Sequence, residues 1–305
     1  MKTPLRSSVR AIFFLTLAAI VLLGSARARA AYVVLQFTAA AGNISGNILT
    51  LNDPHLNGKP GLKLIVTQAV LASGAVFNNA PIGVFYDTTA KEWKIFNENI
   101  AAMPVGAIFN VLIPEIAQRV NGGATNSFGN QTFFNIRKHD SAAFLLQTHL
   151  FDPFPGITSS VINGVFQVSP VGLFFNPIVT TAPIPASSGH WEVFNENLGE
   201  AGAVSYNVAD VTKAGVKGTP YSFLFTTSAS NTTGVFAKIS NPLTDGKPNA
   251  ILFVNHIATT TGAVFNTFYG AGFATPSWGI VTEDSSSMPL GLTFVVTAFP
   301  SVTGS

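Results

Sequence analysis

Cysteine is absent from this chain of 305 residues, and charged residues are scarce, at 10% of the total. The lack of Cys excludes both a disulfide framework and a thiolate metal site. Soluble proteins average roughly 25% charged residues, so the charged fraction here is low. The hydrophobic fraction, 47%, is too high for an intrinsically disordered protein. We expect a globular protein that is stable without disulfides, as in a bacterial envelope or extracellular setting.

The N-terminus has the order of a secretory signal peptide. Basic residues come first, at Lys2, Arg6 and Arg10, and an apolar run over residues 11–23 and the small-x-small site Ala28-Arg29-Ala30 follow. The run of 13 residues is shorter than the roughly 20 that a membrane helix needs. We therefore expect residues 1–30 to be a signal peptide cleaved after Ala30, and the protein to be secreted or at the cell surface, with no stable transmembrane segment. An uncleaved anchor is the alternative.

Removing this segment reverses the sign of the net charge. It holds five of the 16 basic residues and no acidic residue, so the mature chain has 11 basic and 14 acidic residues and a formal charge of −3. The remaining Lys and Arg are scattered, with Arg137-Lys138 as the one adjacent pair. A basic surface for nucleic acid is therefore not expected.

The mature chain contains an internal repeat. Residues 36–68 align without a gap with residues 224–256, and the matches include Gly58-Lys59-Pro60 with Gly246-Lys247-Pro248. Further on, the Trp93 and Met103 segments match those of Trp278 and Met288, and a more divergent middle copy repeats W-x-[IV]-F-N-E-N at residues 191–197. Self-similarity of this kind defines three β repeats, and the following boundaries are expected: 31–114, 115–213 (divergent) and 219–300.

Short apolar runs between Gly, Asn, Pro and Thr clusters predict strands. In the first repeat these cover residues 32–38, 62–68, 82–87, 92–97 and 107–113. Asn57-Gly58 and Asp245-Gly246 are typical of two-residue hairpins, and residues 113–120 form the one candidate short helix. We predict an all-β fold of three tandem antiparallel β-sandwich or barrel-like repeats, with one pseudo-threefold β assembly as the alternative.

The repeat carries motifs that resemble a known family. They are A-P-I-G-V-F-Y-D at 80–87, W-K-I-F-N-E at 93–98, M-P-V-G at 103–106 and N-P-L-T-D-G-K-P-N-A-I-L at 241–252. Together they resemble an uncharacterised repeat domain of secreted bacterial proteins, although Ala80 and Phe85 stand where its pattern has His and Trp. The resemblance implies an exported β protein and no particular activity.

Residues with catalytic chemistry show no recognised spacing. The five His include no close metal-ligand pattern, no nucleophile elbow is present, and His149 and His256 match Gln68 in the first repeat, an exchange that a metal or catalytic role would not tolerate. Trp93, Trp191 and Trp278 alternate with polar residues along their strands, which favours core positions over an aromatic platform for sugars. We expect no catalytic residues, no metal and no cofactor.

One polar feature recurs after the Trp strand of each repeat. Loop side chains with oxygen atoms can hold Ca²⁺ or another ligand, and they can also hydrogen-bond the backbone of a turn. Both interpretations stay open for the candidate ligand-binding residues, which are Asn97, Glu98, Asn99, Asn195, Glu196, Asn197, Glu283 and Asp284.

The sequence favours a non-catalytic extracellular binding or adhesion protein, because repetition turns weak contacts into avidity. Its ligand would be extracellular, either a glycan or a second copy of the chain. The low charge also favours a self-assembling subunit of a surface layer or matrix. A carbohydrate-active hydrolase is the third hypothesis, since paired carboxylates can meet in space without a sequence signature.

Overall fold

The computed structural model describes residues 32–71, 74–151, 166–179, 187–216, 219–258 and 264–301. The expected signal peptide, residues 1–30, lies outside the described residues. Strands, turns and bends account for the regular structure, as the all-β prediction requires. The part of the chain that is described holds no helix long and apolar enough to cross a membrane.

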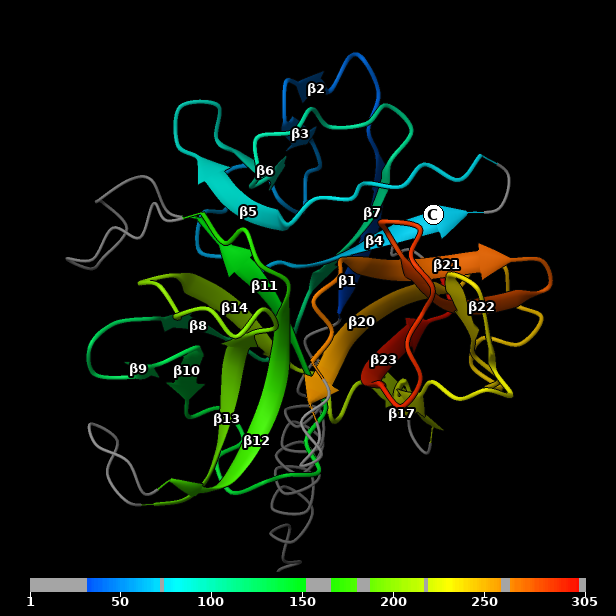
Figure 1. The fold of residues 1–305 in the computed structure, drawn as a ribbon. Helices are drawn as coiled ribbons and strands as arrows, with labels where there is room; N and C mark the ends of the chain where they lie inside the picture. Colours follow the sequence, from blue (N-terminus) through cyan, green and yellow to red (C-terminus); the bar gives the residue numbers. More distant parts are fainter. Residues whose placement is uncertain are drawn as a thin grey trace, which may run out of the picture. The chain divides into compact units, whose positions relative to one another are not determined.

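Strands follow the same order in three consecutive units (Figure 1). The first unit contains β1 (Val33–Thr38), β2 (Ile44–Ser45), β3 (Ile48–Leu51), β4 (Ile65–Leu71), β5 (Ile82–Asp87), β6 (Glu92–Asn97) and β7 (Ile108–Ile113). The middle unit contains β8 (Ala117–Asn121), β9 (Ser127–Phe128), β10 (Gln131–Phe134), β11 (Leu145–Leu150), β12 (Val171–Val179), β13 (Ser187–Asn195) and β14 (Ser205–Asp210). After the small ribbon β15 (Gly215–Val216) and β16 (Thr219–Pro220), the third unit contains β17 (Ser222–Thr226), β18 (Thr232–Thr233), β19 (Phe236–Lys238), β20 (Ile251–Ala258), β21 (Tyr269–Ala274), β22 (Ser277–Thr282) and β23 (Thr293–Phe299).

Each of the three seven-stranded sheets combines strands of two units. Their orders are β1-β7-β4-β21-β22-β19-β18, β8-β14-β11-β5-β6-β3-β2 and β17-β23-β20-β12-β13-β10-β9. In each sheet, three strands of one unit are hydrogen-bonded to four strands of another. The second unit joins the first in this way, the third joins the second, and the first joins the third, which closes a cycle. The structure combines the two predicted architectures. It has three sandwich-like units, and these units share their sheets within one pseudo-threefold assembly.

The units are joined by short parallel pairs within otherwise antiparallel sheets. His149 of β11 pairs with Gly83 of β5, Leu173 of β12 pairs with Ile257 of β20, and Ala271 of β21 pairs with Ala69 of β4. Parallel pairing links segments that are distant in the chain. The register of each junction therefore depends on two units at once.

Apolar side chains form one core inside each unit and a fourth core between the units. The unit cores include the three Trp side chains, each at most 2% exposed, which confirms the predicted core positions. The fourth core draws on β1, β4 and β7, on β11 and β14, and on β20 and β23. Nearly all residues of β4, β11, β14 and β20 are therefore buried, and the polar side chains of β11 (LLQTHL) and β14 (SYNVAD) are buried with the apolar ones.

A cycle of hydrogen bonds joins the three strands β4, β11 and β20, which lie beside one another at the centre of Figure 1. The backbone N–H of Val66 donates to Thr148 Oγ1, that of Gln147 donates to Asn255 Oδ1, and that of Val254 donates to Thr67 Oγ1, over 2.8 to 3.2 Å. Each strand uses a side chain of the next to satisfy a buried backbone donor. We call the line around which these bonds repeat the pseudo-threefold axis.

Two local predictions are wrong. Residues 113–120 do not form a helix, because β7 ends at Ile113 and β8 begins at Ala117, pairing with β14. Asn57-Gly58 and Asp245-Gly246 are not two-residue hairpins, since the preceding residues form a tight turn in which Asn57 N–H donates to Asp53 O. Gly58 alone has the positive φ, 72°, whereas a type I′ hairpin needs two such residues.

Candidate functional site

The recurring carboxylates join consecutive units near the axis. Each lies one residue beyond its Trp strand, is at most 2% exposed, and contacts the matching position of the next unit's inner strand. The pairs are Glu98 Oε1 with His149 Nδ1 at 2.7 Å, Glu196 Oε1 with His256 Nδ1 at 2.5 Å, and Glu283 Oε2 with Gln68 Nε2 at 2.9 Å. We call these three pairs the latches.

Each latch carboxylate also accepts a hydrogen bond from the backbone of the partner unit. The donors are the N–H groups of Gln167 to Glu98, of Phe265 to Glu196 and of Asn78 to Glu283. These donors lie in the loop before β12, β21 and β5 respectively. A single carboxylate thus fixes both an inner strand and a loop of the adjacent unit.

A glycine makes room for each carboxylate. A Cβ on Gly83 would lie 2.8 Å from Glu98 Oε1, and the same addition to Gly172 or Gly270 would overlap Glu196 Oε1 or Glu283 Oε1. Carbon and oxygen atoms cannot approach so closely without displacement. The Gly of the A-P-I-G motif is therefore required by the latch.

The remaining predicted site residues stabilise the turn after each Trp strand. Asn97 and Asn195 are buried and donate to carbonyl groups four and five residues later. Asn99, Asn197 and Asp284 are exposed, and each accepts a hydrogen bond from the N–H two residues later. These are Asx turns. The structure brings Glu98 and Glu283 to one cavity, described below, and leaves the three exposed side chains at the surface.

The third latch differs from the other two. Gln68 replaces a histidine there, and Glu283 Oε1 has no hydrogen-bond partner among the described residues. Burial raises the pKa of Glu283 to about 8, although the hydrogen bond from the Asn78 backbone opposes the rise. The Glu283 carboxyl group is therefore largely protonated at neutral pH.

A cavity of about 100 Å³ lies on the pseudo-threefold axis, next to the latches. All three units line it with matching inner-strand positions and with the loops before β5, β12 and β21. Its polar lining residues are Thr67, Gln68, Glu98, Gln147, Thr148, His149, Gln167, Ser169, Asn255, Tyr269 and Glu283. One water needs only ~10–15 Å³ of such space, so the cavity can hold a small molecule. We call it the axial cavity.

The middle unit makes the cavity asymmetric. Gln147 stands at the position of Val66 and Val254, as the central hydrogen-bond cycle shows. Gln147 Oε1 and His149 Nε2 have no hydrogen-bond partner among the described residues, although both side chains are more than nine-tenths buried. A buried polar atom without a partner costs about 1–3 kcal/mol. These two atoms are therefore an exception that calls for an explanation.

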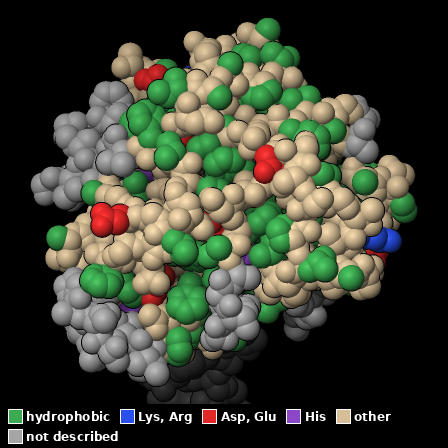
Figure 2. Space-filling model, in the orientation of Figure 1, with side chains coloured by type: hydrophobic (Ala, Val, Ile, Leu, Met, Phe, Trp, Pro, Cys, Tyr) green, Lys and Arg blue, Asp and Glu red, His purple; other side chains and the backbone are tan. Residues whose placement is uncertain are grey.

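Exposed apolar side chains recur in the loops that precede β12 and β21 and in the loops that follow a latch carboxylate. Ten large hydrophobic residues are exposed in the described part of the chain, and seven of them lie in the loop before β12 or β21 or in the loop after a latch carboxylate. The seven are Ile100, Val105, Phe166, Val168, Leu198, Val264 and Leu290. We call these loops the axial loops. The face in Figure 2 has many hydrophobic side chains and few Lys or Arg.

Two of these side chains stand on a costly backbone conformation. Ile100 has φ 64° and Leu198 has φ 60°, at matching positions two residues after their latch carboxylates. Ile100 is 69% exposed and Leu198 is 64% exposed. A β-branched residue in the left-handed region is rare, because its Cβ crowds the backbone.

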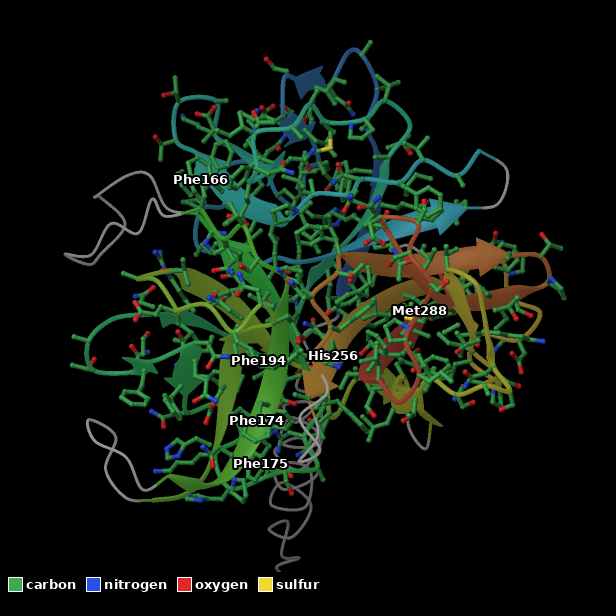
Figure 3. All side chains as sticks on the ribbon, in the orientation of Figure 1. Phe166, Phe174, Phe175, Phe194, His256 and Met288 are labelled. Carbon is green, nitrogen blue, oxygen red and sulfur yellow. The ribbon has the colours of Figure 1, made fainter. Side chains whose placement is uncertain are left out.

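A second group of titratable side chains flanks Trp191 in the middle unit. Glu192 of β13 is fully buried and lies across from Phe133 and Phe174. Burial raises the pKa of Glu192 to about 7, although the nearby Asn176 side chain opposes the rise. Burial and the nearby positive charge of Lys138 lower the pKa of His190. Figure 3 labels Phe174 on β12 and Phe194 on β13, the strand that carries Glu192.

Sequence reasoning found the carboxylates but missed their partners. The equivalence of Gln68, His149 and His256 is visible in the repeat alignment, yet the alignment does not say that each meets the carboxylate of the preceding unit. The exchange of Val for Gln at position 147 is also visible, and it is the sequence signal that could have indicated the asymmetric cavity. A polar residue at an apolar position of a repeat marks a departure from packing alone.

Comparison with known proteins places the chain in a family. Two regions, residues 24–149 and 182–298, match the model of a domain of unknown function, DUF7452. Each region covers a terminal unit and part of the middle unit. No curated protein matches the chain, and no solved structure does. Because the two matches cover more than half of the sequence, the chain belongs to the DUF7452 family.

Proposed function

We propose that this protein is an exported, non-catalytic binding or adhesion protein, and that the axial loops form its binding face. The observation that carries the proposal is Ile100, whose exposed side chain stands on a left-handed backbone. Leu198 repeats the arrangement in the middle unit. Strained backbone positions of this kind are found at ligand contacts, where function compensates for a cost of about 1–3 kcal/mol.

The chemistry of these side chains favours an apolar partner surface. Six of the seven exposed axial-loop side chains are aliphatic, and Phe166 is the one aromatic ring among them, whereas the flat faces of sugar rings stack on aromatic rings. The three Trp side chains are buried and leave no indole platform for a glycan. A protein surface with apolar side chains is therefore the partner that we propose.

The use of the carboxylates supports binding over hydrolysis. Glu98 accepts two hydrogen bonds and Glu196 accepts two, all from groups of the next unit. A general acid or nucleophile needs access to substrate and a fixed partner. Both oxygens of Glu98 and of Glu196 are bonded to the next unit, so these carboxylates are not available to a substrate.

The proposal also includes export of the protein and three copies of the family's repeat. The basic, apolar and small-residue order of residues 1–30 supports export, and the matching strand orders of the units support three copies of the family's repeat. N-terminal sequencing of protein from the medium or envelope should begin at Ala31. An intact Met1 in the cytosol would contradict export.

Binding to the producing cells tests the face directly. Fluorescently labelled mature protein is added to cells of its source, and wild type is compared with a double variant, Ile100→Asn with Leu198→Asn. Asn accepts left-handed backbone, so the double variant keeps the fold. The control is Leu224→Asn, because Leu224 on β17 is 57% exposed but lies outside the axial loops.

We expect the double variant to lose at least nine-tenths of the bound protein, and the control to bind as wild type does. Equal binding by all three proteins would exclude the axial loops. If wild type forms large assemblies that the double variant does not form, the partner is a second copy of the chain, and the protein is a structural subunit. Turnover of a polysaccharide, ester or peptide by the purified protein would overturn the non-catalytic assignment.

A further inference from the structure

The axial cavity has a polarity that packing does not explain. Val66 and Val254 fill their unit cores at the position where the middle unit has Gln147. The same unit has Tyr206 where the others have Phe109 and Phe294, and the Tyr206 hydroxyl donates to Gln167 Oε1. Two polar replacements near one cavity destabilise a core unless they gain a partner.

The open atoms of the cavity are hydrogen-bond acceptors. His149 Nδ1 lies 2.7 Å from Glu98 Oε1. When Nδ1 donates to this oxygen, Nε2 of the neutral ring has a lone pair. Gln147 Oε1 also accepts. A ligand that satisfies both atoms must therefore supply O–H or N–H donors.

The charges around the cavity disfavour anionic ligands. No Lys or Arg is among the described residues that line it, so a carboxylate or phosphate would find no countercharge. Glu98 uses both oxygens on His149 and the Gln167 backbone. Glu283 has one open oxygen, and its largely protonated carboxyl group can donate a hydrogen bond to a hydroxyl oxygen.

We propose that the axial cavity binds one small uncharged polyol, between glycerol and a hexose in size, through Gln147 Oε1 and His149 Nε2. Each hydroxyl group donates to one of these acceptors, and Ile82, Val171 and Phe268 of the lining cover the carbon atoms. This site is distinct from the exposed side chains of the axial loops. The two proposals therefore fail or hold independently.

Titration calorimetry of the mature protein with glycerol, xylitol and glucose tests the site, with succinate and ethanolamine as charged probes of similar size. The variant is Gln147→Val, which restores the residue found at positions 66 and 254 and should fold. The matched control is Gln118→Val, since Gln118 is an exposed residue of β8 outside the cavity lining. Nitrogen-15 NMR of the His149 ring reports contact at Nε2.

We expect wild type to bind at least one polyol, with a shift of the Nε2 resonance, and the affinity to fall at least tenfold in Gln147→Val and to stay unchanged in Gln118→Val. Binding that is equal in wild type and Gln147→Val would overturn the proposal. Preference for succinate or ethanolamine would overturn the ligand class. No heat and no Nε2 shift with any polyol at 100-fold excess over protein would leave the cavity as a water site only, and would also overturn it.

Discussion

Gln68 Nε2 donates a hydrogen bond to Glu283 Oε2 across 2.9 Å, between residues 215 positions apart in the chain. This pair closes the cycle of units, because the other two latches join units that are consecutive in sequence. It is also the latch in which one carboxylate oxygen, Glu283 Oε1, has no partner among the described residues. The closure between the first and last units is therefore the least satisfied of the three.

Replacing Gln68 with His should strengthen this closure. A histidine at position 68 would place Nδ1 opposite Glu283 Oε1, as His149 does for Glu98. Because the Glu283 carboxyl group is largely protonated at pH 7, the new hydrogen bond joins two neutral groups and contributes about 0.5–1.5 kcal/mol, so we expect Gln68→His to raise the free energy of unfolding by about 1 kcal/mol. Urea denaturation at pH 7 measures the change. Gln68→Ala is the control and should destabilise, because it removes the donor.

The stability of the protein should fall as pH rises from about 4.5 to 8. The pKa of Glu283 is raised from its ordinary value of 4.5 to about 8 in the folded state, so the folded chain holds a proton that the unfolded chain has released. The unfolded state then binds fewer protons, and the free energy of unfolding decreases with pH at up to ~1.4 kcal/mol per unit. Glu192, with its pKa raised to about 7, acts in the same direction.

The variant Glu283→Gln isolates the first contribution. It has no ionisation at this site, so its stability relative to wild type should increase by a few kcal/mol between pH 5 and pH 9. Denaturation curves at pH 5, 7 and 9 give the difference. A difference that stays constant with pH would show that Glu283 keeps its ordinary pKa.

Adding a methyl group at Gly270 should disrupt the same latch. The Cβ would overlap Glu283 Oε1 and lie 2.7 Å from the backbone oxygen of Gln68, and the latter cannot move without shifting β4. Overpacking of this kind costs about 1–3 kcal/mol. Thermal unfolding of Gly270→Ala measures it. The matched control is Gly61→Ala, because a Cβ at Gly61 meets nothing within 4 Å.

The sequence predicts the strands well and their pairing poorly. The expected ranges 82–87 and 92–97 are the observed bounds of β5 and β6, because alternating and β-branched residues determine strands locally. The partner of β5 outside its own hairpin is β11, and no local signal indicates a parallel neighbour from another unit. The short strands β2 and β3 were missed, since two to four residues carry little periodicity.

The sequence identified the residues of the candidate site but did not indicate that the carboxylates join neighbouring units. Repetition identified Glu98, Glu196 and Glu283, and turn chemistry correctly anticipated the backbone hydrogen bonds of Asn99, Asn197 and Asp284. The contacts of the carboxylates cross between units, so their burial depends on how the sheets are shared. Whether any of the eight residues contacts a ligand stays a prediction.

The shared sheets predict that the mature chain unfolds in one step. Each unit contributes three strands to one sheet and four to another, and residues of all three units form the fourth core. Trp93→Ala, Trp191→Ala and Trp278→Ala should each lower the midpoint of the same single transition, by the equivalent of about 3–5 kcal/mol. Circular dichroism and tryptophan fluorescence should report coincident curves.

A fragment of residues 31–114 should not fold by itself. It would retain its own core, but β4 would lose β21, β5 would lose β11, and the apolar faces of Val34, Ile65 and Leu112 in the fourth core would be exposed to water. A pair of sheets reduced to three and four strands, with one inner face uncovered, buries too little apolar surface to offset the loss of chain entropy. Amide NMR of the fragment should therefore show the narrow dispersion of an unfolded chain. A well-dispersed spectrum, or three separate transitions in the full chain with each Trp variant shifting only one, would show that the units are independent modules.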